Sequence, residues 1–124
     1  MATENHYPLS EEQKILVIDR THRYIEQAEQ TFSISTRAFS IRFDLKGRAA
    51  GMYRTKQRLL KTDRDIRYNP YIFSRYFEDN LRTTIPHEVA HYVSDIIYGL
   101  KNIRPHGKEW QQIMQAFGAD ASVT

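Results

Sequence analysis

Hydrophobic side chains in the first part of the chain recur with the period of a helix. Ile15, Ile18 and Ile25 are three and seven residues apart, a spacing that gathers side chains on one helix face. Ser10 has a glutamine three residues after it, which is the arrangement of a capping box. The pattern therefore predicts an amphipathic helix over residues 10–32.

Alternating apolar and polar residues then predict three short strands. The first covers residues 39–46, and the Lys-Gly-Arg sequence at 46–48 is a plausible turn into a second strand at 49–54. Residues 55–63 are polar and are predicted to be a connection, and residues 64–69 form the third strand. We expect these strands to make a small antiparallel sheet.

The second half of the chain has the apolar spacing of helices. Helices are predicted over residues 70–79, 81–98 and 107–117, with a glycine directly after the second and third of them. Pro86 falls inside the middle segment, so that helix either begins just before the proline or is kinked there. The order of elements predicts an α+β fold with a three-stranded sheet and about four helices.

Composition narrows the class of protein. With 124 residues and 40% hydrophobic side chains, the chain is expected to fold as one domain over residues 1–124, with a flexible tail over residues 1–9. The absence of cysteine excludes disulfides, a cysteine nucleophile and cysteine-ligated metal sites. No apolar run approaches the roughly 20 residues of a membrane span, so we expect no membrane contact and a cytoplasmic location.

The net charge of +3 is unevenly distributed. Residues 37–67 contain ten basic and three acidic side chains. Such a concentration is typical of a surface that faces a polyanion, and nucleic acid is the commonest partner of that kind. The same segment is also compatible with a solvated surface that binds nothing, and the sequence leaves both interpretations open.

The residues with the clearest chemistry lie in the segment His87-Glu88-Val89-Ala90-His91. Histidines four positions apart lie on one helix face, one turn apart, so both imidazoles can reach the same metal ion. The glutamate can reach a water molecule at that ion without being a ligand. Zinc is the ion expected at a nitrogen-rich site of this kind.

A catalytic zinc requires a third protein ligand, and three downstream residues are candidates. Asp95 lies one turn beyond His91 and can instead orient a ligand histidine. Glu109 and His106 follow His91 by 18 and 15 residues. On chemistry alone we favour His106 over Glu109.

These motifs together resemble the SprT-like family of zinc metallopeptidases. The resemblance rests on the His-Glu-x-x-His segment at 87–91, on Arg-Pro-His-Gly-Lys-Glu-Trp at 104–110, and on Ile-Arg-Tyr-Asn-Pro at 66–70. It implies a minimal zincin-like metalloprotease fold and zinc-dependent endopeptidase activity. The functional residues that it implies are the zinc ligands His87, His91 and His106 and the general base Glu88.

The family also includes Spartan-type proteases, which degrade proteins crosslinked to DNA. The resemblance therefore implies protein substrates that are associated with DNA, a DNA partner, and a possible location at the nucleoid. Many members carry a cysteine-containing zinc ribbon, which this chain lacks. Either the chain is a fragment or this member has no ribbon, and in both cases DNA contact falls to residues 37–67.

Two other functions compete with this interpretation. One is a DNA-binding or regulatory module with a structural or vestigial zinc site, and the other is a general metallopeptidase without a DNA link. The presence of Glu88 favours a working site, because a structural zinc has no use for a base.

Small residues over 47–51 would let a substrate backbone approach one strand closely. The donor for the oxyanion is left open among Tyr53, Tyr68, Tyr92, Tyr98 and Arg104.

Overall fold

The structure is a computed structural model that describes residues 7–122. Within that range a long helix precedes three strands, and helices follow, which confirms the predicted α+β class with its three-stranded sheet. The elements are α1 (Glu11–Phe32), β1 (Ser40–Arg42), β2 (Gly51–Gln57), β3 (Thr62–Tyr68), α2 (Pro70–Arg75), α3 (Phe77–Arg82), α4 (Thr84–Tyr98), the short 3₁₀ helix η1 (Leu100–Asn102) and α5 (Lys108–Ala116).

Helix α1 has the predicted ends, and its predicted apolar face is buried in part, at Ile25. Its capping box is present, with Ser10 Oγ accepting from the Gln13 backbone N–H at 3.1 Å. The predicted apolar stripe is wrong at Ile15, which is 67% exposed. Thr21 is fully buried instead, because its hydroxyl hydrogen-bonds to Tyr68 Oη at 2.8 Å and so satisfies a polar group inside the core.

The sheet is mixed, with strand order β1-β3-β2, so the prediction of an antiparallel sheet is wrong for one of its two pairings. Strands β2 and β3 form an antiparallel hairpin, whereas β1 runs parallel to β3. The chain reverses direction after β1, but it first crosses the end of β3, so β2 lies on the far side of β3 and not beside β1. At this crossing the Leu45 N–H donates to the Tyr68 carbonyl and the Asn69 N–H to the Ala50 carbonyl. Strand β3 takes the centre because Ile66 and Tyr68 are fully buried.

The predicted polar connection over residues 55–63 is also wrong. Strand β2 continues to Gln57 and β3 begins at Thr62, so only four residues remain for the turn. Polar residues can form these strand ends, because the hydrogen bonds that pair β2 with β3 are made by the backbone and need no apolar side chains. By contrast, β1 is shorter than the predicted strand over 39–46.

The helical half follows the prediction with one break. The helix predicted over residues 70–79 is divided at Tyr76 into α2 and α3. Helix α4 begins at Thr84, so Pro86 lies in its first turn. Backbone N–H groups in the first turn make no hydrogen bond within the helix, so a proline there, which has no N–H, breaks none. The helix is therefore continuous through the two histidines.

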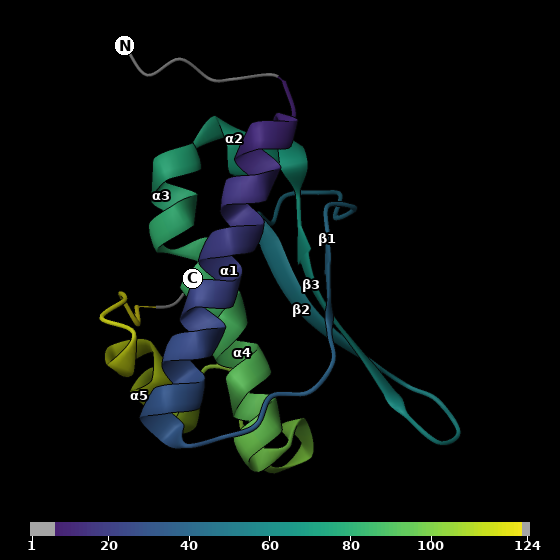
Figure 1. The fold of residues 1–124 in the computed structure, drawn as a ribbon, viewed down its shortest axis with the longest axis vertical. Coiled ribbons are helices and arrows are strands. Elements are labelled where there is room, and N and C mark those ends of the chain that lie inside the picture. Colours follow the sequence, from purple (N-terminus) through teal and green to yellow (C-terminus); the bar gives the residue numbers. More distant parts are fainter. Residues whose placement is uncertain (1–6, 123–124) are drawn as a thin grey trace.

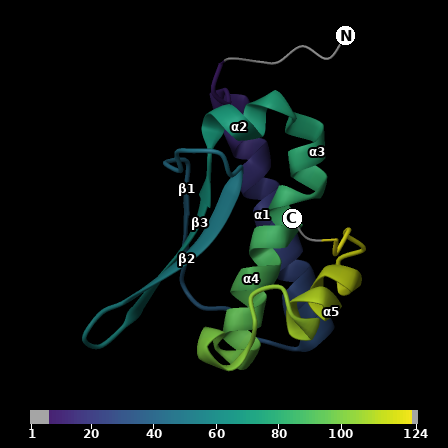
Figure 2. The ribbon, with the colours of Figure 1, turned by 180° about the vertical axis from the view of Figure 1, so that it is seen from behind.

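Helices α1 and α4 lie on the same side of the sheet, and the β2–β3 hairpin extends beyond them (Figures 1 and 2). Buried side chains of β3 and α4 belong to one core, which includes Ile66, Val89 and Val93. Helix α5 joins this core through Trp110 and Ile113, as its spacing predicts. The packing fixes α4 between the sheet and α5 and so sets the position of its histidines.

The start of the chain was predicted to be a flexible tail over residues 1–9. Residues 1–6 lie outside the described part of the structure. Leu9 is not part of such a tail, because it is buried in the core and its N–H donates to the Pro70 carbonyl at 3.0 Å. Across residues 7–122, none of the helices combines the length and the apolar character that a bilayer span requires.

Candidate metal centre

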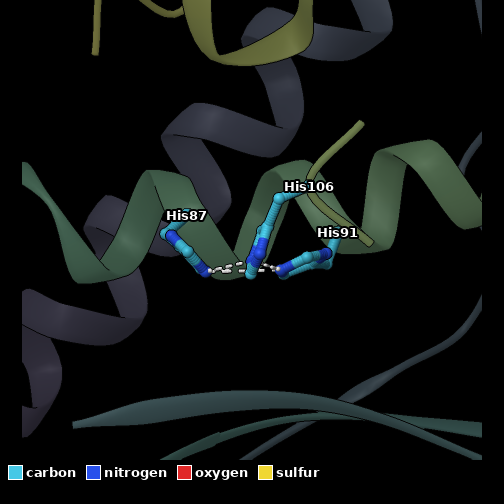
Figure 3. A group of neighbouring side chains, drawn as sticks. All are labelled: His87, His91 and His106. Carbon is cyan, nitrogen blue, oxygen red and sulfur yellow. Dashed lines mark hydrogen bonds between the residues drawn. The ribbon is translucent and has the colours of Figure 1, made fainter. Parts of the chain in front are cut away.

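Three histidines meet above the sheet, as Figure 3 shows. His87 and His91 project from successive turns of α4, and His106 reaches them from the loop before α5. The Nε2 atoms of His87 and His91 are 3.3 Å apart, and those of His106 lie 3.1 Å from His87 and 3.0 Å from His91. His106, which the sequence favours as the third ligand, is therefore the candidate that joins His87 and His91.

This donor set fits a metal cation. Burial lowers the pKa of His87 to about 4 and that of His91 to about 3, so both imidazoles are neutral at pH 7. Three Nε2 atoms turned toward one point cannot satisfy all three mutual contacts with protons, because each contact needs one donor and one acceptor. Tetrahedral zinc, with Zn–N bonds of about 2.0–2.1 Å, needs nitrogen atoms roughly 3.3–3.4 Å apart. The His87/His91/His106 cluster can therefore hold a metal ion.

Trp110 supports all three histidines, a role that its sequence pattern did not indicate. Its indole Nε1–H donates to the His87 carbonyl at 3.2 Å. Its ring centroid lies 4.9 Å from that of His87, 5.6 Å from that of His91 and 4.8 Å from that of His106. The side chain was predicted to belong to the core, and it is fully buried there while also forming the floor of the centre.

The other two candidates for the third ligand are not in the cluster. Asp95 Oδ2 accepts from Tyr53 Oη at 2.6 Å and from Arg64 Nε at 3.1 Å. Asp95 therefore fastens the β2–β3 hairpin to α4. Glu109 lines a separate cavity with Tyr98.

Glu88 lies beside the centre and is buried. Its Oε2 atom is 3.9 Å from His87 Nε2. Burial raises the pKa of Glu88 to about 8, and the backbone N–H of Tyr53 opposes this shift by hydrogen bonding. A cation held by the histidines would favour the charged carboxylate. Glu88 therefore lies next to the point on which the three histidines converge.

A cavity of about 580 Å³ opens beside Glu88, between α4 and the start of β2. Gly51 permits this close approach, because a Cβ atom there would lie 2.8 Å from Thr84 Cγ2 and 3.0 Å from Glu88 Cγ. Strand β2 pairs with β3 along one edge only, and its other edge has no strand beside it among residues 7–122. A second cavity, of about 320 Å³, is lined by side chains that include Tyr53, His91 and His106.

The structure reduces the number of candidates for an oxyanion donor. The hydroxyls of Tyr53, Tyr68 and Tyr92 are engaged by Asp95, Thr21 and the Arg37 backbone, respectively. Tyr98 lines the cavity that contains Glu109 rather than either cavity beside the histidines. Arg104, two residues before His106, is exposed, and it too lines neither of these cavities.

Comparisons with known proteins agree with this site. The SprT-like family profile matches residues 21–123. Protein SprT of Pseudomonas savastanoi pv. phaseolicola is 38% identical over 96 residues, which cover 77% of this chain and 54% of the relative. Protein SprT of Vibrio parahaemolyticus is 40% identical over 101 residues, covering 81% of this chain and 56% of the relative. Protein SprT of Pseudomonas aeruginosa is 36% identical over 96 residues, covering 77% and 54%.

The chain spans about half the length of these curated relatives. No solved structure matches it significantly. The family match covers most of the chain and includes α4, the loop that carries His106, and α5. By its sequence, and with three histidines arranged to hold a metal, the chain belongs to the SprT-like family.

Proposed function

We propose that the protein is a zinc-dependent endopeptidase that acts on DNA-associated or DNA-crosslinked proteins. The observation that carries the proposal is the convergence of three Nε2 atoms within 3.0–3.3 Å of one another, next to the buried carboxylate of Glu88. A structural metal site needs no such carboxylate beside it. The pairing of three nitrogen ligands with an adjacent carboxylate therefore favours hydrolysis.

In this proposal His87, His91 and His106 hold the zinc ion. When bound, zinc would supply Lewis-acid chemistry, polarising a carbonyl oxygen and making water a better nucleophile at neutral pH. Glu88 accepts the proton of the attacking water and later returns it to the leaving amine. Its burial keeps bulk water away from the proton that it carries.

The free edge of β2 supports an extended polypeptide as the substrate. Backbone N–H and C=O groups on that edge can pair with a substrate strand, as in other cases of strand addition. The edge begins at Gly51, which lies against Glu88, so a chain bound along it passes the histidines. The cavity of about 320 Å³ contains Leu100, Ile103 and Pro105, and it suits an apolar substrate side chain.

The DNA link rests on residues 37–67 and on the resemblance to Spartan-type proteases. That segment contains ten of the 18 basic residues of the chain. A basic surface of this kind would bring the protease to proteins that are bound to DNA. A cytoplasmic location at the nucleoid is part of the same proposal.

The test combines metal analysis with cleavage of casein and histones, each with and without DNA. We expect one zinc ion per chain, and we expect Glu88→Gln to retain zinc while lowering the cleavage rate by about 10²–10⁴-fold. An inactive wild type that still binds zinc and DNA would favour a binding module instead. Cleavage that is indifferent to DNA would favour a general metallopeptidase.

A further inference from the structure

The β2–β3 hairpin forms an arm that projects from the body of the molecule (Figures 1 and 2). Strand β1 pairs with β3 only from Asp65 to Arg67, so the outer part of the hairpin is a ribbon of two strands. The Arg58 N–H donates to the Lys61 carbonyl at 2.7 Å and closes the turn. Leu59 and Leu60 therefore occupy the two central positions at the tip.

The residue types at the tip are unusual for a tight turn. Central turn positions favour glycine, asparagine, aspartate, proline and serine, each for a conformational reason. Leu59 and Leu60 are 96% and 94% exposed, so neither contributes to the core. Two adjacent exposed leucines at the end of an arm depart from the residue preference of turns and from the usual burial of leucine. Such departures are typical of a site of interaction.

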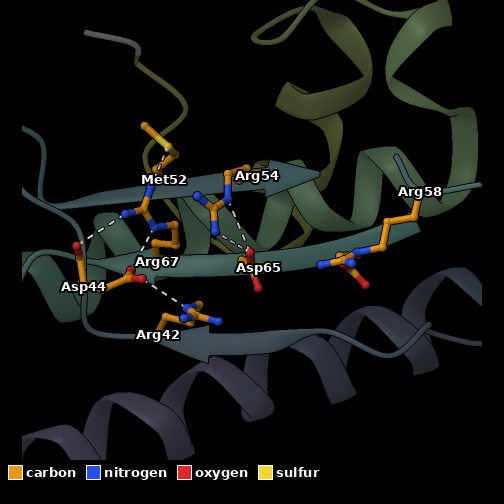
Figure 4. Close-up of polar contacts among 8 residues, drawn as sticks. Arg42, Asp44, Met52, Arg54, Arg58, Asp65 and Arg67 are labelled. Carbon is orange, nitrogen blue, oxygen red and sulfur yellow. Dashed lines mark hydrogen bonds and ion pairs between the residues drawn. The ribbon is translucent and has the colours of Figure 1, made fainter. Parts of the chain in front are cut away.

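Arginine side chains lie along the sheet from the arm toward its base, on the face opposite α4, as Arg58, Arg54 and Arg67 show in Figure 4. A groove of about 720 Å³ beside them is lined by six basic and two acidic residues, although one of the six, Arg64, turns its guanidinium group toward Asp95 of α4. Asp65 binds Arg54 and Asp63 binds Arg58, and these ion pairs orient the guanidinium groups while leaving them 42% and 55% exposed. The basic residues that line the groove are Arg42, Arg54, Lys56, Arg58, Lys61 and Arg64.

The arrangement favours an elongated polyanion over a flat anionic surface. A bilayer that took up the two leucines would reach Arg58 and Lys61 beside them, but not the cations at the base of the arm, such as Arg42. A nucleic acid that lies along the ribbon can meet cations at both places. The aromatic residues of the hairpin, Tyr53 and Tyr68, cannot stack on bases, because they pack on the side of the helices.

We propose that the β2–β3 hairpin is a DNA-binding arm whose basic residues contact phosphates while Leu59 and Leu60 insert between bases. Two-stranded ribbons enter DNA grooves, and apolar wedges such as leucine partly unstack and kink the duplex. The inference rests on the proposed DNA partner and adds the surface and the manner of binding. It predicts little sequence preference, since the arm presents no set of side chains that reads base edges.

The first experiment tests the leucines with a fluorescein-labelled duplex and with a duplex that carries a donor and an acceptor dye. Replacing both leucines (Leu59→Ser with Leu60→Ser) should weaken binding by about tenfold and remove a bend of about 20–90°. The salt dependence of binding should keep its slope, because the charge of the arm is unchanged. Ile15→Ser, which removes an exposed apolar side chain on α1, is the matched control and should change neither affinity nor bend.

The second experiment tests the cations with the same duplex. Lys56→Glu with Lys61→Glu should weaken binding and reduce the slope of log affinity against log salt by about 0.9 for each phosphate that the arm no longer neutralises. Lys101→Glu, a charge reversal on η1, should leave the slope unchanged.

If the variant with both leucines replaced binds and bends DNA like the wild type, the arm is not a wedge, although the proposal of a DNA partner stands.

Two further outcomes also contradict the proposal. If the wild type binds vesicles that contain phosphatidylglycerol through these leucines and does not bind DNA, the arm meets a lipid surface instead. If the wild type binds no duplex at low ionic strength, the arm and the DNA partner both fail. The peptidase proposal is judged separately, by zinc content and by casein cleavage without DNA.

Discussion

Burial decides the chemistry of single residues at the metal centre. The imidazoles of His87 and His91 remain neutral because the protein around them disfavours a charged ring, and a neutral nitrogen is what a metal requires. The same burial acts on Glu88 in the opposite sense and raises the pKa of its carboxyl group. One local environment therefore prepares both the ligands and the adjacent base for a cation.

The identity of the third ligand gives the first prediction. His106→Ala should weaken zinc affinity far more than Glu109→Ala, because only His106 turns a nitrogen toward the other two histidines. Isothermal titration with zinc, together with the metal content after dialysis, measures the difference. A Glu109→Ala protein that loses its metal while His106→Ala keeps it would reverse the assignment.

Gly51 gives a second prediction at the same scale. Gly51→Ala should destabilise the fold by about 1–3 kcal/mol through overpacking. The added methyl group would meet Thr84 Cγ2 at 2.8 Å. Combining it with Thr84→Ser, which removes that methyl group and keeps the hydroxyl, should recover part of the stability in urea unfolding. Met52→Ala, on the exposed face of β2, is the control. If the double variant recovers no stability, the clash with Thr84 is not the cause of the destabilisation.

Among the elements, the attachment of the β2–β3 hairpin to α4 is the contact that shapes the cavity lined by Tyr53, His91 and His106. Asp95 of α4 accepts hydrogen bonds from Tyr53 of β2 and Arg64 of β3, and thus holds both strands. Arg64 and Asp95 are only 13% and 10% exposed, so their ion pair is screened much less than a surface pair.

This attachment gives the third prediction. Asp95→Ala should lower the free energy of unfolding by about 3 kcal/mol, because it leaves the Arg64 guanidinium buried without its partner. Asp79→Ala breaks the exposed pair with Arg82 and should change stability by less than about 1 kcal/mol. Urea denaturation of the two variants provides the comparison. Equal effects would mean that the hairpin is held by other contacts.

The sequence was most informative where a feature depends on neighbours along the chain. His87 and His91 share a face by helical spacing alone, and Pro86 marks the start of α4. His106 came from ligand chemistry together with the family resemblance. The support by Trp110 and the hydrogen bonds of Asp95 involve residues brought together only by the fold, so no local pattern indicates them. Likewise, alternation predicts a strand at β1 but does not say which strand lies beside it.

For the molecule as a whole, binding of a metal ion by these histidines would be coupled to folding. Two ligands come from α4 and the third from the loop before α5, so the complete set exists only when these elements are packed together. A ligand that binds the folded state alone raises the free energy of unfolding in proportion to the logarithm of its concentration.

The fourth prediction follows from this coupling. Zinc at about a hundredfold above its Kd should stabilise the fold by about 2.7 kcal/mol, and chelation by EDTA should reverse the gain. Thermal melts over a zinc titration measure it, and Glu88→Gln should respond like the wild type because it keeps all three ligands. His106→Ala should respond much less. A wild-type melting temperature that does not change with zinc would contradict the proposed centre.

The open edge of β2 also has a consequence for crowded solutions. A strand edge that can accept a substrate can also accept the same edge of another copy, and such pairing leads to aggregation. Arg54 and Lys56 lie along this strand and are exposed, so two edges that approach each other bring like charges together. Salt weakens that repulsion. Concentrated protein should therefore stay monodisperse at low ionic strength and begin to self-associate as salt is added. Each pairing of two β2 edges would also cover the cavity beside Gly51 in both copies.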